Sequence, residues 1–478
     1  MWLLWLSASM AQTPLTYEEA LREALVSNPS LRAARLTREG ASASVFTSRG
    51  IFDPMFAANG SWGQSQTRGF FQGFPFKSDS KTWDAGLALS GSAFSGTSYA
   101  LNAGMNRNFS SFVTDFGGLQ SEQTQEAITT NMNVSVTQQL LKGIKFSYNL
   151  QNITKARVGL TIADLQAERA QQEALAQTAQ AYWTWAYQER LQSIAEESLA
   201  AAKESLRINR LKFEAGEISP LALTRIEAAS VQAQGAVVDA KMAAEQTEDA
   251  LLMLIGKSPS DSYSAATQPG EVTLTEVQEQ AAIEVALAQN VDLLVSRANV
   301  DGAQLDTANA KHALLPSLSI TGAAGIRSQD TTVGASVSGL ADEDAFPFVS
   351  VSGQFSVPLG NRAARGEAKR LSVQVQQQQR TLQDLEASVA AEVAQQVRVL
   401  RSSEQRVALA DANLRLAEQT LAAEEALAEV GRSIQKTILE AHAEVDRTRA
   451  EAAKARTDYR VAQVMLLKLQ GQLSPQLP

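Results

Sequence analysis

The chain has 478 residues and a formal net charge of −9, and 44% of its residues are hydrophobic although only 6% are aromatic. It has no sustained basic block, which argues against a nucleic-acid partner. The absence of cysteine excludes disulfides, thiolate catalysis, thiolate metal sites and lipid attachment to a cysteine of this sequence.

The first residues predict export. A short apolar stretch is followed by Ser9-Met10-Ala11, a small-x-small pattern that is typical of a signal-peptide cleavage site. We therefore expect residues 1–11 to be a secretory signal peptide, although the usual basic region is missing. The alternative is a disordered apolar N-terminus. No stretch reaches the ~20 apolar residues that a spanning helix needs.

One segment pattern occurs twice. Residues 24–31 recur as residues 286–293, and each copy is followed by the same order of helix, strands, very long helix, glycine break and helix. A unit this long is not a solenoid repeat, so it predicts a pseudo-symmetric protomer. We expect a first repeat over 12–262 (strands about 54–141, helical hairpin about 144–256) and a second over 263–478 (strands about 317–358, hairpin about 362–470).

Six segments alternate between apolar and small or polar residues, at about 55–64, 82–90, 98–106, 128–137, 317–327 and 348–357. Such segments are typical of outer-membrane barrels, although a soluble sheet with one wet face alternates in the same way. Long polar loops expected at 67–81, 109–127 and 328–346 favour the barrel. Open sheet edges are not tolerated in lipid, so we expect several chains to share one barrel.

Two proline-free runs, about 146–214 and 363–429, predict helices of ~100 Å at 1.5 Å per residue. Each run ends at a glycine, Gly216 or Gly431, which is the usual left-handed end of a helix, and each is followed by an antiparallel partner. The aromatic cluster at 182–187 indicates packing in a wider part of the helical body. The second run has a coiled-coil seam at Leu382, Leu385, Val389, Val393, Val397, Leu400, Val407, Leu414, Leu421 and Ala428.

The order of these elements resembles the TolC-like outer-membrane factor family. The matching pieces are Ala20-Leu21-x3-Leu25-x2-Asn28-Pro29-x-Leu31, the strand-to-helix junctions at 134–143 and 355–360, and the tip pattern Gly216-x2-Ser219-x-Leu221. The resemblance implies an α+β membrane protein and a homotrimer. Its strands would form one shared outer-membrane barrel, and its helical hairpins a periplasmic tunnel. Family barrels usually take four strands from each chain; the pair at 82–107 is extra, and either joins the barrel or forms a hairpin elsewhere.

The resemblance also implies a gate near the tips. Its constriction positions correspond to Thr437 and Glu440 in the second repeat, and Arg225 is the first-repeat equivalent of Glu440. One carboxylate from each chain would form a threefold ring that favours cations. The alternative is that Glu440 is a solvated helix residue paired with a neighbour. Because the tips are exposed, the periplasmic adaptor is expected to dock at Ala215, Gly216, Glu217, Val430, Gly431 and Arg432.

No catalytic constellation is recognisable. The two histidines, His312 and His442, lie in different contexts, and neither a cofactor nor a metal is expected. The leading hypothesis is a passive exit duct of a tripartite efflux or type I secretion system, energised by an inner-membrane pump. The alternatives are a non-membrane coiled-coil scaffold of the cell envelope and a general porin, in which helices of this length have no role. Whether drugs, metals or proteins are exported depends mainly on the partners.

Overall fold

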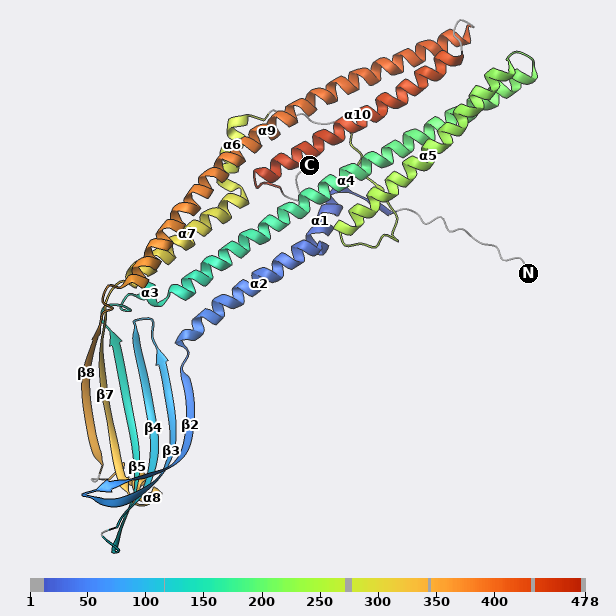
Figure 1. The fold of residues 1–478 in the computed structure, drawn as a ribbon. Coiled ribbons are helices and arrows are strands. Elements are labelled where there is room, and N and C mark those ends of the chain that lie inside the picture. The colour runs from blue at the N-terminus through green and yellow to red at the C-terminus, as the bar shows by residue number, and fades with distance from the viewer. Residues whose placement is uncertain (1–12, 116, 271–276, 343–344, 431–434, 474–478) are drawn as a thin grey trace, which may run out of the picture. The chain divides into compact units, whose positions relative to one another are not determined.

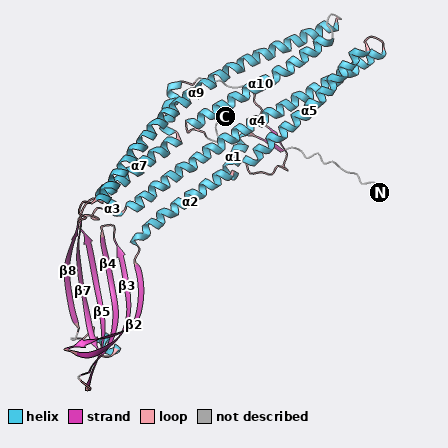
Figure 2. Ribbon diagram, in the orientation of Figure 1, coloured by secondary structure: helices cyan, strands magenta, loops and turns pink. Residues whose placement is uncertain are grey.

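The computed structural model describes residues 13–115, 117–270, 277–342, 345–430 and 435–473. The chain divides into two compact units, and each unit draws segments from both halves of the sequence. The first comprises the chain up to Gly40, Thr161–Ala298 and the chain from Gln379 onward, and the second comprises Ala41–Leu160 and Asn299–Gln378. Long helices and one large sheet make this an α+β fold (Figure 2). The predicted signal peptide lies outside the described residues.

The second unit contains an antiparallel six-stranded sheet with the order β2-β3-β4-β5-β7-β8 (Figure 1). The extra pair predicted at 82–107 is therefore part of this sheet, in the form of β3 and β4. The strands are β2 (Met55–Phe71), β3 (Phe74–Ser92), β4 (Thr97–Asp115), β5 (Gln120–Gln139), β7 (Ser317–Asp330) and β8 (Phe346–Ser356).

The long loops predicted at 67–81 and 109–127 are wrong. Residues 67–71, 74–81, 109–115 and 120–127 are strand, and β2 turns directly into β3 at Gln72 and Gly73. The third predicted loop, 328–346, contains the end of β7 and a short helix, α8 (Val333–Ser338). These outer strand ends carry polar residues on both faces, so the alternation that marked the other strand segments is lost there.

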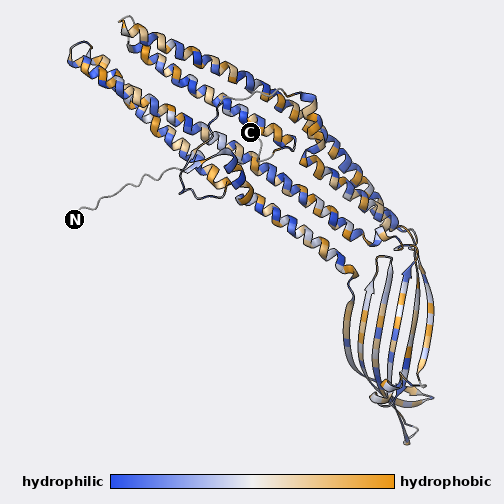
Figure 3. Ribbon diagram, turned by 180° about the vertical axis from the view of Figure 1, so that it is seen from behind, coloured by the Kyte–Doolittle hydropathy of each residue, from blue (hydrophilic) through white to orange (hydrophobic). Residues whose placement is uncertain are grey.

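The sheet has an apolar face and a polar face. Residues paired directly across the strands share a face. One row of the apolar face is Phe56, Leu89, Leu101, Val134, Ala324 and Val349. A row of the polar face is Ser61, Asp84, Asn106, Thr129 and Gln329. Figure 3 shows hydrophobic and hydrophilic residues alternating along these strands.

The helices form the remainder of both units. The long helix α9 matches the predicted run, whereas the first run is divided at Leu150 into α3 and α4. Each returning helix, α5 or α10, has only 35 residues, about 50 Å, so each hairpin is paired over about half of its longer arm. The helices are α1 (Tyr17–Ser27), α2 (Pro29–Arg49), α3 (Phe146–Asn149), α4 (Gln151–Glu214), α5 (Pro220–Leu254), α6 (Glu279–Gln289), α7 (Val291–His312), α9 (Arg362–Glu429) and α10 (Gln435–Leu469).

The core of the helical unit follows the predicted seam and aromatic cluster. Val393 and Val397 of α9 are fully buried against Tyr459 and its neighbours on α10. Tyr182 and Trp185 are buried in a second cluster that includes α1. A small parallel sheet of β1 (Thr13–Leu15) and β6 (Tyr263–Ala265) lies beside this cluster, and the Tyr182 hydroxyl donates to the Leu15 carbonyl at 2.9 Å. No helix among the described residues is both long and apolar enough to cross a membrane.

The two copies of the duplicated pattern make the same hydrogen bonds. Asn28 Nδ2 donates to the carbonyl of Leu254 at 3.2 Å, and its Oδ1 accepts from the amides of Ser30 and Leu31. In the second copy, Asn290 Nδ2 donates to the carbonyl of Leu469 at 2.9 Å. Its Oδ1 accepts from the amides of Asp292 and Leu293. Each asparagine thus caps one helix and fastens the end of a returning helix.

Candidate functional site

The first helical tip has the predicted glycine geometry. Helix α4 ends at Glu214, and Gly216 has a φ of +78°, a left-handed conformation that strongly favours glycine. The amide of Glu217 donates back to the carbonyl of Lys212 at 2.8 Å, which closes the helix end. Ser219 then caps α5 by accepting from the amide of Ala222. Ala215, Gly216 and Glu217 are exposed on this turn.

The second tip is described only at its two flanks. Helix α9 ends at Glu429, Val430 is exposed, and α10 begins at Gln435. The docking positions Gly431 and Arg432 lie outside the described residues. The predicted docking role of both tips remains a prediction.

The constriction candidates lie in the first turns of the two returning helices. Glu440 is exposed on α10 and forms a 3.3 Å ion pair with Lys436, one turn earlier. Within one chain, Glu440 is therefore paired with a neighbour, as the alternative interpretation expected. Thr437 is half-buried on the same helix, and Arg225 is exposed on α5.

Sequence reasoning missed two contacts that fasten the hairpins near their tips. His442 Nε2 on α10 lies 3.4 Å from Glu425 Oε1 on α9. Arg210 on α4 forms a 3.0 Å ion pair with Glu227 on α5. Each pair joins two antiparallel helices, and the tip turn sets which residues of the two helices face each other. The sequence alone does not give the length of that turn, so it does not predict these pairs.

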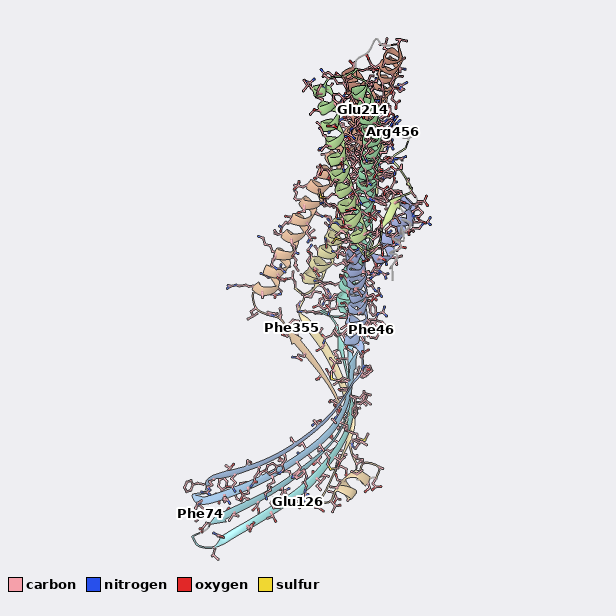
Figure 4. All side chains as sticks on the ribbon, turned by 90° about the vertical axis from the view of Figure 1, so that its right-hand side faces the viewer. Phe46, Phe74, Glu126, Glu214, Phe355 and Arg456 are labelled. Carbon is pink, nitrogen blue, oxygen red and sulfur yellow. The ribbon has the colours of Figure 1, made fainter. Side chains whose placement is uncertain are left out.

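The apolar face of the sheet exposes large side chains to solvent in the isolated chain. Val349 of the edge strand β8 is 80% exposed, and Phe56 of the opposite edge strand β2 is 68% exposed. Trp62 and Trp83 form one cross-strand pair on this face, and charged residues such as Lys81 and Glu126 follow beyond it on the same face. An apolar band that ends at tryptophans is typical of the membrane–water interface. Figure 4 shows Glu126 and Phe74 toward the end of the sheet opposite Phe355.

At the other end of the sheet, His312 closes the junction between strands and helices. The amide of Gly143 donates to His312 Nε2 at 3.5 Å, and the Tyr148 ring packs edge-on at 4.7 Å. Burial lowers the pKa of His312 below its ordinary value of 6.5, and the neighbouring Lys145 and Lys142 lower it further. The imidazole is therefore held in its neutral form. This form leaves a lone pair on Nε2, which accepts the hydrogen bond from the Gly143 amide.

A sheet with a lipid-facing apolar side, joined to long helical hairpins, defines an outer-membrane protein with a periplasmic helical part. The profile of the family described as outer membrane efflux protein matches residues 99–257 and 282–472, more than half of the chain. The chain belongs to this family. It is located in the outer membrane and extends into the periplasm. A search of curated proteins found no match.

Solved outer-membrane channels share the fold. The Campylobacter jejuni CmeC outer membrane channel is 15% identical, with a TM-score of 0.68 over 97% of this chain and 87% of that one. The Vibrio cholerae outer membrane protein VceC is 14% identical, with a TM-score of 0.66 over 95% and 96% of the two chains. The open state of the Neisseria gonorrhoeae MtrE outer membrane channel is 17% identical, with a TM-score of 0.65 over 95% and 88%.

Proposed function

We propose that three copies of this chain form a passive exit duct through the outer membrane. The observation that carries this proposal is the six-stranded sheet with an apolar face and two edge strands. Within the described residues, β2 and β8 each have a sheet neighbour on one side only. An unpaired strand edge in lipid leaves backbone groups without hydrogen bonds, each at a cost of several kcal/mol. Further copies would close the sheet into a barrel by pairing the β2 edge of one with the β8 edge of the next.

Apolar side chains on the hairpins support the same assembly. Leu409 and Leu416 lie seven residues apart on α9 and are exposed in the single chain. Val231 and Val238 are likewise exposed on α5, seven residues apart. Spacing by sevens is that of helices that pack side by side. Neighbouring chains would cover these stripes and complete a helical tunnel.

The proposed duct performs no chemistry of its own. Its exposed tips would receive a periplasmic adaptor, and an inner-membrane pump would supply the energy for efflux or type I secretion. The polar face of the sheet would line the exit, where asparagine and serine side chains are compatible with hydrated solutes. Solute movement would then follow the gradient that the pump establishes.

The test is the purified protein in detergent and in planar bilayers. We expect extraction only with detergent, a heat-resistant trimer on gels and discrete conductance steps. Leu416→Glu should weaken the trimer because it places a charge in the covered stripe. Ala422→Glu adds the same charge at an exposed position about 120° around the helix and should not weaken it. A detergent-independent monomer without conductance would instead identify a periplasmic scaffold.

A further inference from the structure

The β3–β4 hairpin is continuous with the strands on both sides of it. Seventeen residues of β3 pair without interruption with β2, from Met55–Ser90 to Phe71–Phe74. On the other side, β4 pairs with β5 from Thr97–Gln138 to Asp115–Gln120. A hairpin packed outside a barrel would leave β2 and β5 adjacent to each other, but here they are two strands apart.

The hairpin also continues both faces of the sheet. Leu87, Leu89 and Leu101 extend the apolar face, while Asp84, Asn102 and Asn106 lie on the polar face. An odd shift in register would exchange the two faces, so the shared alternation shows that β3 and β4 occupy the same environment as their neighbours.

Polar side chains connect the hairpin to its neighbours on the polar face. The Asp84 carboxylate of β3 accepts from Ser61 of β2 at 2.9 Å and from Asn106 of β4 at 2.5 Å. Asn102 of β4 donates to the Asn133 side chain of β5 at 3.1 Å. A row of such bonds fixes the order of four strands across the sheet.

The turn between β3 and β4 is fastened to the base of the sheet. Gly96 has a φ of +75°, and a Cβ atom at this position would approach the Gly143 carbonyl to 2.1 Å. Asn149 Nδ2 donates to the carbonyls of both Phe94 and Gly143, at 2.9 and 2.7 Å. The Phe94 and Phe146 rings pack at 5.5 Å. These hydrogen bonds and the ring contact therefore hold the turn at the junction where β5 leads into the helices.

We propose that this hairpin is part of the barrel wall, so that the barrel closes with six strands from each chain, eighteen in a trimer. The inference rests on the proposed trimeric duct. Barrel diameter grows roughly linearly with strand number, so the exit would be about 1.5 times as wide as one with four strands per chain. Small residues of the hairpin, Gly86, Ala88, Ala100 and Gly104, keep the inner wall thin.

The hairpin adds strands without adding helices. Of the six strands of the large sheet, β2 and β7 follow helices and β5 and β8 lead into helices, whereas β3 and β4 are joined to their neighbours by turns alone. The outer exit thus widens while the helical part does not. In such a duct the helical tunnel, and not the barrel, would set the upper size limit for hydrophilic solutes.

The first test uses single cysteines, since the native chain has none. In intact cells, a membrane-impermeant maleimide should label Asn102→Cys on the polar face of β4 but not Leu101→Cys on its apolar face. Asn133→Cys and Met132→Cys are the matched controls on β5. Equal labelling of positions 101 and 102, with alternation preserved on β5, would show that the hairpin lies outside the wall and would overturn the inference.

The second test measures the width. Deletion of residues 72–115 removes the hairpin and lets β2 pair directly with β5, which runs in the opposite direction. Polyethylene-glycol maleimides of increasing size are added from outside to label Asn133→Cys. The largest reagent that labels this cysteine should be larger for the full chain than for the shortened chain. An unchanged size limit would overturn the inference.

If the shortened chain does not assemble, an electron-microscopy map of the full-length protein still tests the number of strands in the barrel. Eighteen strands around the ring would support the inference, and twelve would refute it. A protein that forms neither a trimer nor a channel would refute the proposed function itself, which distinguishes the two failures.

Discussion

At the residue scale, Asn28 and Asn290 show why the duplicated pattern recurs in the sequence. Each asparagine uses its oxygen to cap a helix and its amide nitrogen to bind the carbonyl at the end of a helix far along the chain. A shorter serine can cap a helix but does not reach the distant carbonyl. An aspartate lacks the amide donor. Both functions together require asparagine.

We expect Asn28→Ala and Asn290→Ala to lower stability by similar amounts, about 1–3 kcal/mol each, because a cap is lost and a carbonyl is left unpaired. The readout is the temperature at which the purified assembly dissociates. Ser30→Ala, at an exposed neighbour that is bound only through its backbone, is the control. A loss in only one of the two variants would show that the copies are not equivalent.

Glu440 is the residue on which the proposed gate depends most. If its carboxylate forms a ring in the assembly, Glu440→Ala should reduce the cation preference of the channel in bilayers. Removal of its partner by Lys436→Ala should increase that preference, because the ion pair at 3.3 Å offsets the carboxylate charge. Glu451→Ala, farther along the same helix, is the control. Unchanged selectivity in Glu440→Ala would rule out the ring.

His312 predicts a pH dependence of the junction. Because burial lowers its pKa in the folded protein, the unfolded chain binds the proton more readily as the pH falls below about 6.5. The stability that His312 contributes is therefore present above this pH and is lost as the pH falls toward the folded-state pKa. His312→Gln should show a smaller loss of thermal stability between pH 7.5 and pH 5 than the native protein. An equal loss in the two proteins would contradict this prediction.

At the element scale, the first tip is a hydrogen-bonded turn with Gly216 in the left-handed conformation. Gly216→Val should abolish export without preventing trimer assembly. A side chain at φ +78° costs about 1–2 kcal/mol and changes a surface that packs against nothing in the single chain. Gly159→Val, in the interior of α4, where a Cβ atom also meets no neighbour within the chain, is the comparison. Normal transport by Gly216→Val would contradict the docking assignment.

The strands illustrate how far the sequence alone predicts this fold. Alternation located all six strands because lipid and water demand opposite side chains on the two faces. It failed beyond Trp62 and Trp83, where polar residues occur on both faces and phenylalanines are scattered among them, and residues 67–81 and 109–127 resembled loops. Whether the extra pair joined the sheet depended on pairing across the strands, which alternation within one strand does not specify.

The candidate site was predictable to a smaller extent. The turn at Gly216 follows from glycine chemistry and agrees with the prediction. The Lys436–Glu440 pair follows from helical spacing of four residues. The pairing of His442 with Glu425 does not, because it joins two helices whose register depends on the tip between them.

At the scale of the whole molecule, the protein combines a nearly symmetric helical part with an asymmetric sheet. The first repeat contributes four strands and the second contributes two. The helical elements of the two repeats, in contrast, match almost one for one. Under the proposed function, conduction through the tunnel is set by elements common to both halves, and the width of the exit is set by the first half alone.

The long-range hydrogen bonds of the first repeat also constrain the order in which parts of the chain can fold. Asn28 reaches a carbonyl 226 positions later, and Tyr17 donates its amide to a residue 250 positions later. The apolar side of α1 therefore stays uncovered until the whole first hairpin has been synthesised. Long-range contacts of this kind are slow to form and expose the chain to aggregation. We expect the first half of the chain to be the part that most needs a chaperone on its way to the membrane.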